Sequence, residues 1–586
     1  MNEGSPTIAR RGTGWLLVLM PVICFLLLGA CWVLSTPPGA GVDEASHYVR
    51  MVGMSHGELI GDRVPADFEL GGLAGTQLAR VVKEAGVFRI PGDKPPPSGC
   101  NGLEVTAPFI CPQAGQTAGS SREVSLHGRY LPLSYVFPAV LSLAGHTTWR
   151  TLALGRLGFL LQDAALLLLI VLALRRCVPR FSSTALGMLA LCGTPLLLFQ
   201  SGTLAPNGTE VLAVVAFAIA LVTTLRLRSR GWLWIAALVG SAASWTRDLG
   251  AFEVAVFGVA VLALDPGSAR WLWARRRTRD VFAAVVLALA GLGASVWQLV
   301  LKAPLPVRLE SPSRVWADLG SSVGLLRDSI GLVGWSDLPI DPVVQALWEI
   351  GWLAGLAVLF LRAPRRARVV AAVLGALYFV LDAAMISGFR HAGFGAQSRF
   401  TIAFPIMVVV LLVAVQPAGA AASTASTASN ASNASTASTA GMTRPGWPQR
   451  WRRHWPLGAA CAVFALGQFS ALLISAHHNA NGINGDKMDF AHAAWVPPGG
   501  WYPSLLAYGI ASASVFALPV LATVFGGRRA TPRLTSATQL TSATSATSVT
   551  SATSATSATS ATSATSATSA TSATELAPAT LPGAPP

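Results

Sequence analysis

Apolar runs about as long as a bilayer is thick recur through most of the chain. A helix needs about 20 largely apolar residues to cross the hydrocarbon core of a membrane. The sequence therefore predicts an all-α polytopic membrane protein with about 12 transmembrane helices. The predicted spans are 14–35, 151–174, 182–201, 208–226, 231–247, 249–266, 281–302, 345–362, 369–387, 401–416, 456–475 and 504–526.

The apolar run at 130–145 is not counted among these spans. A span there would move Arg175, Arg176 and Arg180 to the outer side, whereas Lys and Arg concentrate in cytoplasmic loops. The run contains Pro and Tyr residues typical of an interface. We therefore expect an interfacial or re-entrant helix on the outer face, packed against the bundle.

Composition and charge are consistent with this topology. Apolar residues make up 52% of the chain and charged residues 12%, which disfavours a soluble protein. The net charge of +15 by itself suggests nucleic-acid binding, but the basic clusters lie beside apolar runs, as they do in cytoplasmic loops. We therefore expect no nucleic-acid partner, a multi-pass protein of the cell (inner) membrane, and both termini in the cytoplasm. The outer segments are then 36–150, 202–207, 303–344, 388–400 and 476–503.

Composition also divides the chain into segments. Two low-complexity segments have too few large apolar residues to offset chain entropy, so both are expected to be disordered. The first span is expected to remain as an anchor, because no small-residue cleavage site precedes Pro37. The predicted segments are a cytoplasmic N-terminus at 1–13, a transmembrane core at 14–416 with an external loop at 36–150, a cytoplasmic low-complexity linker at 417–455, a C-terminal transmembrane hairpin at 456–526 and a Ser-Ala-Thr repeat tail at 527–586.

The seven cysteines have no metal-binding spacing. Most lie in apolar spans, where a thiol behaves as a small hydrophobic group. Cys100 and Cys111 share the large outer loop, where an oxidising exterior would allow a disulfide. The sequence leaves the paired and the free state of these two open.

The first candidate for chemistry follows the first span directly, in the acidic pair Asp43 and Glu44. Carboxylates close to hydrocarbon are costly and are often functional. Asp43 could act as a general base on an acceptor hydroxyl, or Asp43, Glu44 and His47 could hold a divalent cation. If 43–56 is helical, Asp43 and His47 share one face. The alternative is that both acids cap this helix.

Further polar motifs are expected near the same membrane surface. Arg399 could bind phosphate oxygens or could snorkel from the end of a span. Trp335 could be a sugar platform, although an aromatic-belt anchor is favoured. The candidate substrate-binding residues are His47, Arg129, Tyr130, Arg156, Asn207, Trp335, Asp337, Gln397 and Arg399.

Four acids lie within or at the ends of predicted spans. Intramembrane acids are site candidates by default, with the pairing of helices as the alternative. They are Asp163, Glu210, Asp248 and Asp382.

Several of these motifs occur in a fixed order along the chain and together resemble a known family. The order is Pro38…Asp43-Glu44…His47-Tyr48, Tyr130-Leu131-Pro132…Tyr135, Pro206-Asn207-Gly208…Glu210, Gly334-Trp335…Pro339 and Gln397-Ser398-Arg399…Pro405. It resembles a large bacterial family of predicted membrane proteins of unknown function (domain of unknown function 2142). That family in turn is similar to the GT-C superfamily of polyprenyl-phosphate-sugar-dependent glycosyltransferases.

The resemblance implies a GT-C-like helical core with juxtamembrane helices in the first external loop. It implies an inverting enzyme that moves a sugar from a polyprenyl-phosphate donor to an envelope glycan or protein on the outer face. Asp43 falls where the superfamily keeps its catalytic carboxylate, with Glu44 or His47 orienting the acceptor and Arg399 steadying the phosphate. The sequence indicates no definite cofactor, and a divalent cation held by Asp43, Glu44 and His47 is compatible with it.

Two function classes remain as alternatives. A transporter or flippase of lipid-linked glycans would be marked by inverted repeats and by broken helices in matching halves. A non-enzymatic envelope scaffold would account for the repeat tail, but it leaves the outer charges without a use.

Overall fold

A computed structural model describes most of the membrane core and part of the external loop. The Cys100–Cys111 pair, Trp335 and the repetitive stretches of both low-complexity segments lie outside the described residues, so the predictions about them stay predictions. The described ranges are 8–65, 75–94, 96, 120–178, 181–274, 276–302, 310–334, 337–392, 394–416, 447–482 and 489–517.

Helices dominate the described residues. Six of them are long and apolar enough to cross a membrane, and two bent pairs of helices raise this number to at most eight. The six are α5 (Thr148–Cys177), α8 (Asn207–Leu227), α12 (Thr278–Leu301), α14 (Pro342–Arg362), α15 (Arg365–His391) and α18 (Trp447–Asn481), and the bent pairs are α6 (Ser183–Leu191) with α7 (Pro195–Gly202) and α10 (Gly250–Leu264) with α11 (Pro266–Ala274).

The remaining predicted spans coincide with three shorter helices and with a first helix whose apolar part, Leu19–Ser35, is also short. A helix rises about 1.5 Å per residue, so the 15 residues of α9 extend about 22 Å, less than the hydrocarbon core. The count of twelve spans therefore stays a prediction. The helices concerned are α1 (Ile8–Ser35), α9 (Arg230–Ser244), α16 (Ala403–Ala414) and α19 (Trp501–Ser514).

The break between α6 and α7 follows from the local sequence. Thr194 accepts a hydrogen bond from the backbone N–H of Leu197, and Pro195 occupies the first turn of α7. Proline is favoured there because its missing N–H has no intrahelical partner in the first turn. The predicted span 182–201 is therefore two helices, bent by 51°.

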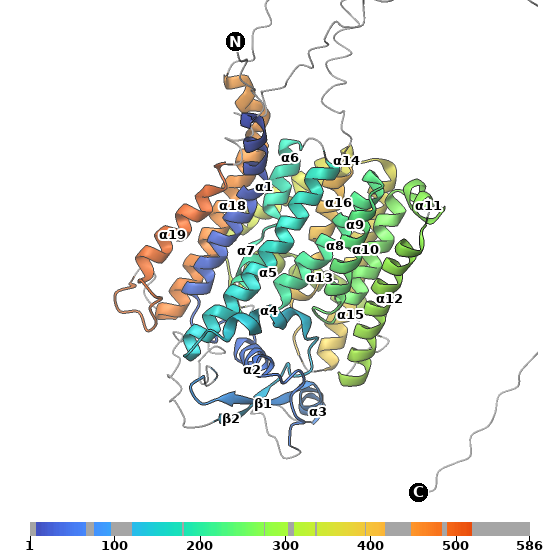
Figure 1. The fold of residues 1–586 in the computed structure, drawn as a ribbon. Coiled ribbons are helices and arrows are strands. Elements are labelled where there is room, and N and C mark those ends of the chain that lie inside the picture. The colour runs from blue at the N-terminus through green and yellow to red at the C-terminus, as the bar shows by residue number, and fades with distance from the viewer. Residues whose placement is uncertain are drawn as a thin grey trace, which may run out of the picture. The chain divides into compact units, whose positions relative to one another are not determined.

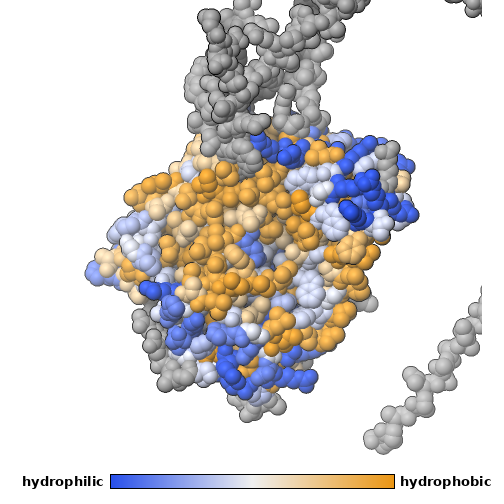
Figure 2. All heavy atoms as spheres, viewed as in Figure 1, coloured by the Kyte–Doolittle hydropathy of each residue, from blue (hydrophilic) through white to orange (hydrophobic). Residues whose placement is uncertain are grey.

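Apolar helices occupy both the centre and the edge of the bundle. Residues 207–225 of α8 are all buried, and α8 contacts α5, α7, α9, α10 and α16. In α12 only Asp280, Ala283 and Ala294 are buried. Figure 1 shows α12 at the edge of the bundle and Figure 2 shows a broad apolar surface between more hydrophilic ends. Hydropathy alone does not separate a central from a peripheral helix, because lipid is as apolar as the protein core.

A small layer of helices and strands covers one end of the bundle (Figure 1). The segment 43–56, considered as a possible helix, forms α2 from Glu44 to Ser55. A helix is confirmed within 130–145, where α4 packs against α2 and α5. Residues Tyr48, Phe88 and Tyr135 form part of the apolar core of this layer. Its elements are α2 (Glu44–Ser55), α3 (Gly75–Glu84), β1 (Gly86–Pro91), β2 (Ser120–Ser125) and α4 (Leu133–Ser142), with β1 antiparallel to β2 from Gly86↔Ser125 to Pro91↔Ser120.

The predicted outer segment 303–344 contains a further long helix. Its sequence has too many polar residues to stand out as a span, and it packs mainly against α15. The Asp318 carboxylate and the Arg390 guanidinium, 2.6 Å apart, join the two helices. The elements of this region and the next outer segment are α13 (Pro312–Gly331), β3 (Leu332–Val333), β4 (Leu338–Pro339) and the 3-10 helix η1 (Ser398–Phe400).

Candidate functional site

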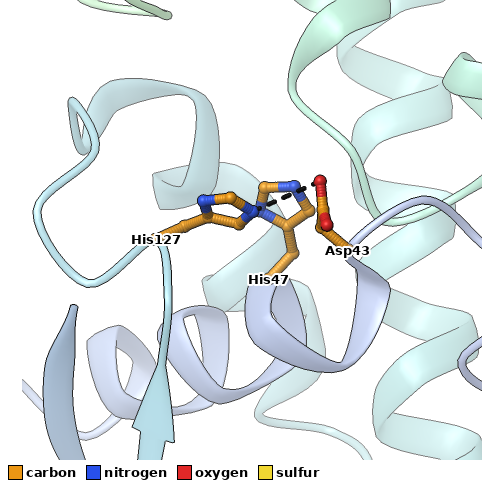
Figure 3. A group of neighbouring side chains, drawn as sticks. All are labelled: Asp43, His47 and His127. Carbon is orange, nitrogen blue, oxygen red and sulfur yellow. Dashed lines mark ion pairs between the residues drawn. The ribbon is translucent and has the colours of Figure 1, made fainter. Parts of the chain in front are cut away.

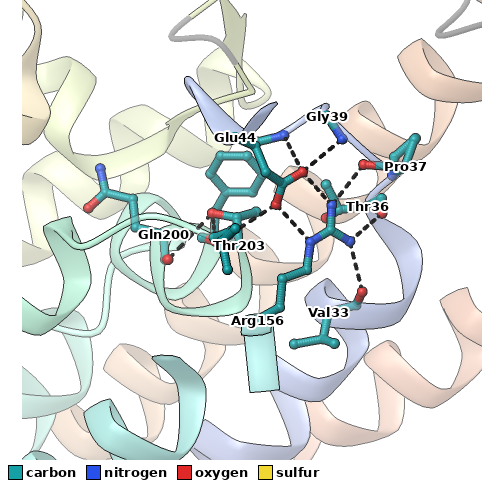
Figure 4. Close-up of polar contacts among 11 residues, drawn as sticks. Val33, Thr36, Pro37, Gly39, Glu44, Arg156, Gln200 and Thr203 are labelled. Atoms are coloured by element: carbon teal, nitrogen blue, oxygen red, sulfur yellow. Dashed lines mark hydrogen bonds and ion pairs between the residues drawn. The ribbon is translucent and has the colours of Figure 1, made fainter. Parts of the chain in front are cut away.

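Glu44 and Arg156 form a buried ion pair where α1, α2 and α5 meet (Figure 4). Neither side chain is exposed to solvent. Glu44 Oε1 accepts from Arg156 Nε at 2.7 Å and from Leu204 N at 3.0 Å. Glu44 Oε2 accepts from Arg156 Nη2 at 2.6 Å and from the backbone N–H groups of Gly39 and Gly41.

Arg156 extends this network to the end of the first helix. Its guanidinium donates to the backbone carbonyls of Val33, Thr36 and Pro37 at 3.0, 2.6 and 2.8 Å. Such a two-pronged contact fixes geometry, because the planar guanidinium fits the carboxylate in one orientation. The arrangement favours a positioning role for Glu44 and Arg156 over the catalytic and substrate-binding roles predicted for them.

Asp43, the neighbouring acid, is placed differently. It occupies the N-cap position of α2 in the left-handed conformation, with φ 55° and ψ 19°, and its side chain makes no capping hydrogen bond. Asp43 therefore lies at the predicted cap position but does not cap α2 through its side chain. Its Oδ2 instead accepts a hydrogen bond from Arg399 Nη2 at 2.9 Å. The pair joins two residues that are 356 positions apart and both predicted as site residues.

The surroundings of Asp43 hold its carboxylate in the charged form. Burial by itself raises the pKa of Asp43, but the Arg399 guanidinium, a hydrogen bond with His127 and the charges of His127 and His47 together lower that pKa below its ordinary value. The side chain of Asp43 is still 26% exposed. An accessible carboxylate of this kind can meet a ligand, whereas the Glu44 carboxylate cannot.

Two stacked histidines lie beside Asp43 (Figure 3). The rings of His47 and His127 are 4.4 Å apart between centroids and 22° from parallel. His127 Nε2 lies 3.5 Å from Asp43 Oδ2, and His47 Nδ1 lies 2.7 Å from the Tyr135 hydroxyl. Burial is the largest cause that lowers the pKa of His47, and the charges of His127, Arg399 and Arg247 lower it further against the effect of Asp43.

The loop that carries His127 is tied to α2 by hydrogen bonds. Arg50 donates to the backbone carbonyls of Gly128 and Tyr130, and the His127 N–H lies 3.2 Å from the Ser46 hydroxyl. Gly128 is required for this approach, because a Cβ there would lie 2.3 Å from the backbone nitrogen of Gly86. The α2 helix therefore places both histidines, one directly and one through its contacts with this loop.

Further cationic groups surround this cluster. Arg247, in the turn between α9 and α10, lies 3.4 Å from Glu210, and its guanidinium stacks over the Phe400 ring at 4.7 Å. Lys302 pairs with Asp248 at 2.6 Å and lies over the Tyr130 ring at 3.5 Å. Burial, the charge of Asp248 and those of other nearby acids raise the pKa of Tyr130. Arg399 also keeps a buried Nε with no hydrogen-bond partner among the described residues.

The other predicted site residues are only partly brought together. The backbone carbonyl of Arg129 accepts from Trp297 Nε1 at 2.9 Å, Asn207 is buried at the start of α8, and Gln397 immediately precedes η1. Asp337 lies elsewhere, lining a small cavity with Thr36, Phe199 and Ser475.

Two of the four intramembrane acids pair helices. Asp163 of α5 accepts from the hydroxyl of Ser201 at 2.6 Å and from that of Thr209, which links α5 to α7 and α8. Asp382 accepts from the hydroxyl of Thr401. For these two the structural alternative is favoured, whereas Glu210 and Asp248 pair with cations beside the Asp43 cluster.

Arg247 and Lys302 were not predicted from the sequence. His127 and Tyr135 begin and end a stretch that was expected near the site, but neither was named as a site residue, because no spacing rule pairs either of them with His47. Arg247 and Lys302 each lie at the outer end of a predicted span, a place shared by many basic residues that only anchor helices. A charged residue at an outer span end, against the cytoplasmic preference, was the available signal.

Comparison with known proteins identifies the family of this chain but no activity or substrate. No curated protein and no solved structure matches the chain. The model of one family matches residues 25–416, which include the helical bundle up to α16 and every residue of the Asp43 cluster. The chain belongs to the family described as predicted membrane protein (DUF2142).

Proposed function

We propose that this chain is a GT-C-like glycosyltransferase of the cell membrane. It takes a sugar from a polyprenyl-phosphate donor and transfers it to a cell-envelope acceptor on the outer face. The observation that carries the proposal is the Asp43–Arg399 contact of 2.9 Å, which joins a base candidate to a phosphate-binding candidate. The excess of basic residues at the opposite ends of the predicted spans supports the outer placement.

In this proposal Asp43 is the general base. It takes the proton of the acceptor hydroxyl while the hydroxyl oxygen bonds to the anomeric carbon of the sugar. The bond between that carbon and the phosphate oxygen breaks, and the polyprenyl phosphate leaves with the electron pair. Attack opposite the leaving group inverts the anomeric centre. Asp43 is ionised and partly exposed, so it can accept a proton. Its lowered pKa makes it a weaker base than an ordinary carboxylate.

Arg399 is assigned to the phosphate. Its guanidinium is largely buried, and charge-assisted hydrogen bonds to phosphate oxygens are strongest in such surroundings. Arg247 and Lys302 lie near enough to add positive potential, which favours an anionic head group. Glu44 and Arg156 position α2 without touching the substrate, which revises the catalytic role predicted for Glu44.

The test is a transfer assay in proteoliposomes with a labelled polyprenyl-phosphate sugar. Asp43→Asn keeps the shape of the side chain and tolerates the left-handed backbone, so the variant should insert normally and lose transfer by at least about 100-fold. The matched control is Asp62→Asn, because Asp62 also pairs with an arginine, Arg122 at 2.7 Å, but is exposed. Full activity of Asp43→Asn would refute the assignment.

The same vesicles separate the enzyme from a flippase. The bends in α6–α7 and α10–α11 are the kind of discontinuity that transporters use. Turnover without movement of the donor lipid between leaflets supports the enzyme. Movement of the donor without turnover supports the flippase.

A further inference from the structure

The Asp43 cluster has the composition of a metal site. Asp43, His47 and His127 each offer one ligand atom, and these atoms lie within 4.8 Å of one another. In Figure 3 the two rings and the carboxylate face one another. Four ligands at about 2.1 Å from a tetrahedral ion lie about 3.4 Å apart. The 3.5 Å separation of His127 Nε2 and Asp43 Oδ2 matches that spacing. Because all three ligand atoms lie within 4.8 Å of one another, His47 needs a shift of about 1.5 Å or less.

A partner for the far side of one histidine is present. Metal-bound histidines usually donate the N–H of their second ring nitrogen to a neighbouring oxygen. The Tyr135 hydroxyl lies 2.7 Å from His47 Nδ1 and is buried. If Nδ1 carries the proton, it donates to Tyr135, and Nε2 keeps the lone pair that a metal requires.

The charges near the cluster do not prevent metal binding. A carboxylate has about four acceptor positions, so Asp43 can keep its hydrogen bond from Arg399 and still ligate an ion. A divalent ion with two neutral histidines and one carboxylate has a charge of +1. Together with Arg399, the occupied site would favour an anionic ligand at its remaining position.

We propose that Asp43, His47 and His127 bind one divalent transition-metal ion, with Tyr135 positioning His47. Two imidazole nitrogens and one carboxylate suit Zn²⁺, Fe²⁺, Co²⁺ or Mn²⁺ better than Mg²⁺ or Ca²⁺, which prefer oxygen ligands. Three protein ligands leave a position open, as in catalytic rather than structural sites. This replaces Glu44 with His127 in the predicted ligand set, because both oxygens of Glu44 are occupied by Arg156 and backbone donors. The site does not rest on the proposed function.

The test measures metal alone, with no sugar present. The purified full-length protein in lipid nanodiscs is dialysed against Zn²⁺, Mn²⁺ or Mg²⁺, and bound metal is counted by elemental analysis. We expect one equivalent of Zn²⁺ and at least tenfold weaker binding of Mg²⁺. His127→Ala should weaken Zn²⁺ binding at least tenfold, and Tyr135→Phe by about 10- to 100-fold. The absorption spectrum of bound Co²⁺ should change in both variants.

Two further variants make the result specific. His146→Ala removes an exposed histidine of the same outer layer and should leave Zn²⁺ binding unchanged. Arg399→Gln should bind Zn²⁺ at least as tightly as the parent protein, because a nearby positive charge is removed. Thermal unfolding of each variant identifies a loss of binding that results from misfolding, and Tyr135→Phe provides a second variant if His127→Ala fails to fold.

The proposal is overturned if folded His127→Ala binds Zn²⁺ like the parent, if His146→Ala loses as much binding, or if Mg²⁺ is preferred. Its failure differs from failure of the proposed function. Sugar transfer by the parent protein, together with unchanged Zn²⁺ binding by folded His127→Ala, would overturn the metal site and support the transferase. Zn²⁺ binding through these residues without transfer would support the metal site and count against the transferase.

Discussion

Loss of charge at two adjacent acids, Glu44 and Asp43, should have different effects: mainly a loss of stability at Glu44 and mainly a loss of transfer at Asp43. Glu44→Gln places an amide where a carboxylate accepts five hydrogen bonds, two of them from Arg156. In either orientation the new NH₂ group faces at least two donors. Arg156 then keeps three carbonyl partners but no countercharge in a fully buried position. Breaking one side of a buried pair typically costs about 3 to 5 kcal/mol.

The assay is thermal unfolding of purified protein in detergent, followed by tryptophan fluorescence. Glu44→Gln should lower the unfolding midpoint clearly more than Asp43→Asn, because Asp43 is partly exposed and its pair with Arg399 is less costly to disturb. Glu58→Gln is the matched control. Glu58 accepts one hydrogen bond from the backbone N–H of Arg89 at 3.0 Å, so its loss should change stability little.

One outcome would contradict the positioning role of Glu44. If Glu44→Gln unfolds at the parent temperature and abolishes sugar transfer, Glu44 acts chemically and not as a positioning residue. Residual transfer by the folded fraction of Glu44→Gln, together with none by Asp43→Asn, agrees with a positioning role for Glu44 and a general-base role for Asp43.

Three other predictions concern the phosphate contact, the His127 loop and the bundle. Arg399→Gln should lower kcat/KM for the lipid donor by about 10- to 100-fold through the loss of one charge-assisted contact. Arg122→Gln, which removes an arginine from an exposed pair, should leave kcat/KM unchanged. Equal effects of the two variants would argue against a phosphate role for Arg399. Gly128→Ala should lower the free energy of unfolding by about 1 to 3 kcal/mol by overpacking, and it should slow transfer by displacing His127. Gly291→Ala, with open space around it, should change neither. Normal transfer by Gly128→Ala would show that the close approach of Gly128 to Gly86 is not needed. Asp163→Ala should lower the free energy of unfolding by about 1 to 3 kcal/mol and leave the transfer rate of the folded protein unchanged. A lower transfer rate at unchanged stability would assign Asp163 to the site.

Local features of the structure were largely predictable from the sequence. Apolar runs predicted the helices because a membrane-spanning backbone must satisfy its own hydrogen bonds. The helix within 130–145 followed from its apolar composition and the charge rule, and the helix after Asp43 was considered only as a possibility. The helix α13 did not, since its polar residues, such as Asp318, are satisfied by partners distant in the sequence, such as Arg390.

What the sequence determined by itself was the membrane class and the approximate positions of many of the helices, and it named Asp43 and Arg399 as candidate site residues. Only the tertiary structure decided the roles of two neighbouring acids. Glu44 turns inward to Arg156, and Asp43, in a left-handed conformation, turns to Arg399 and the histidines. Sequence spacing carries no information on such pairs, because contacts between residues 112 or 356 positions apart depend on how the helices pack and not on local backbone preference.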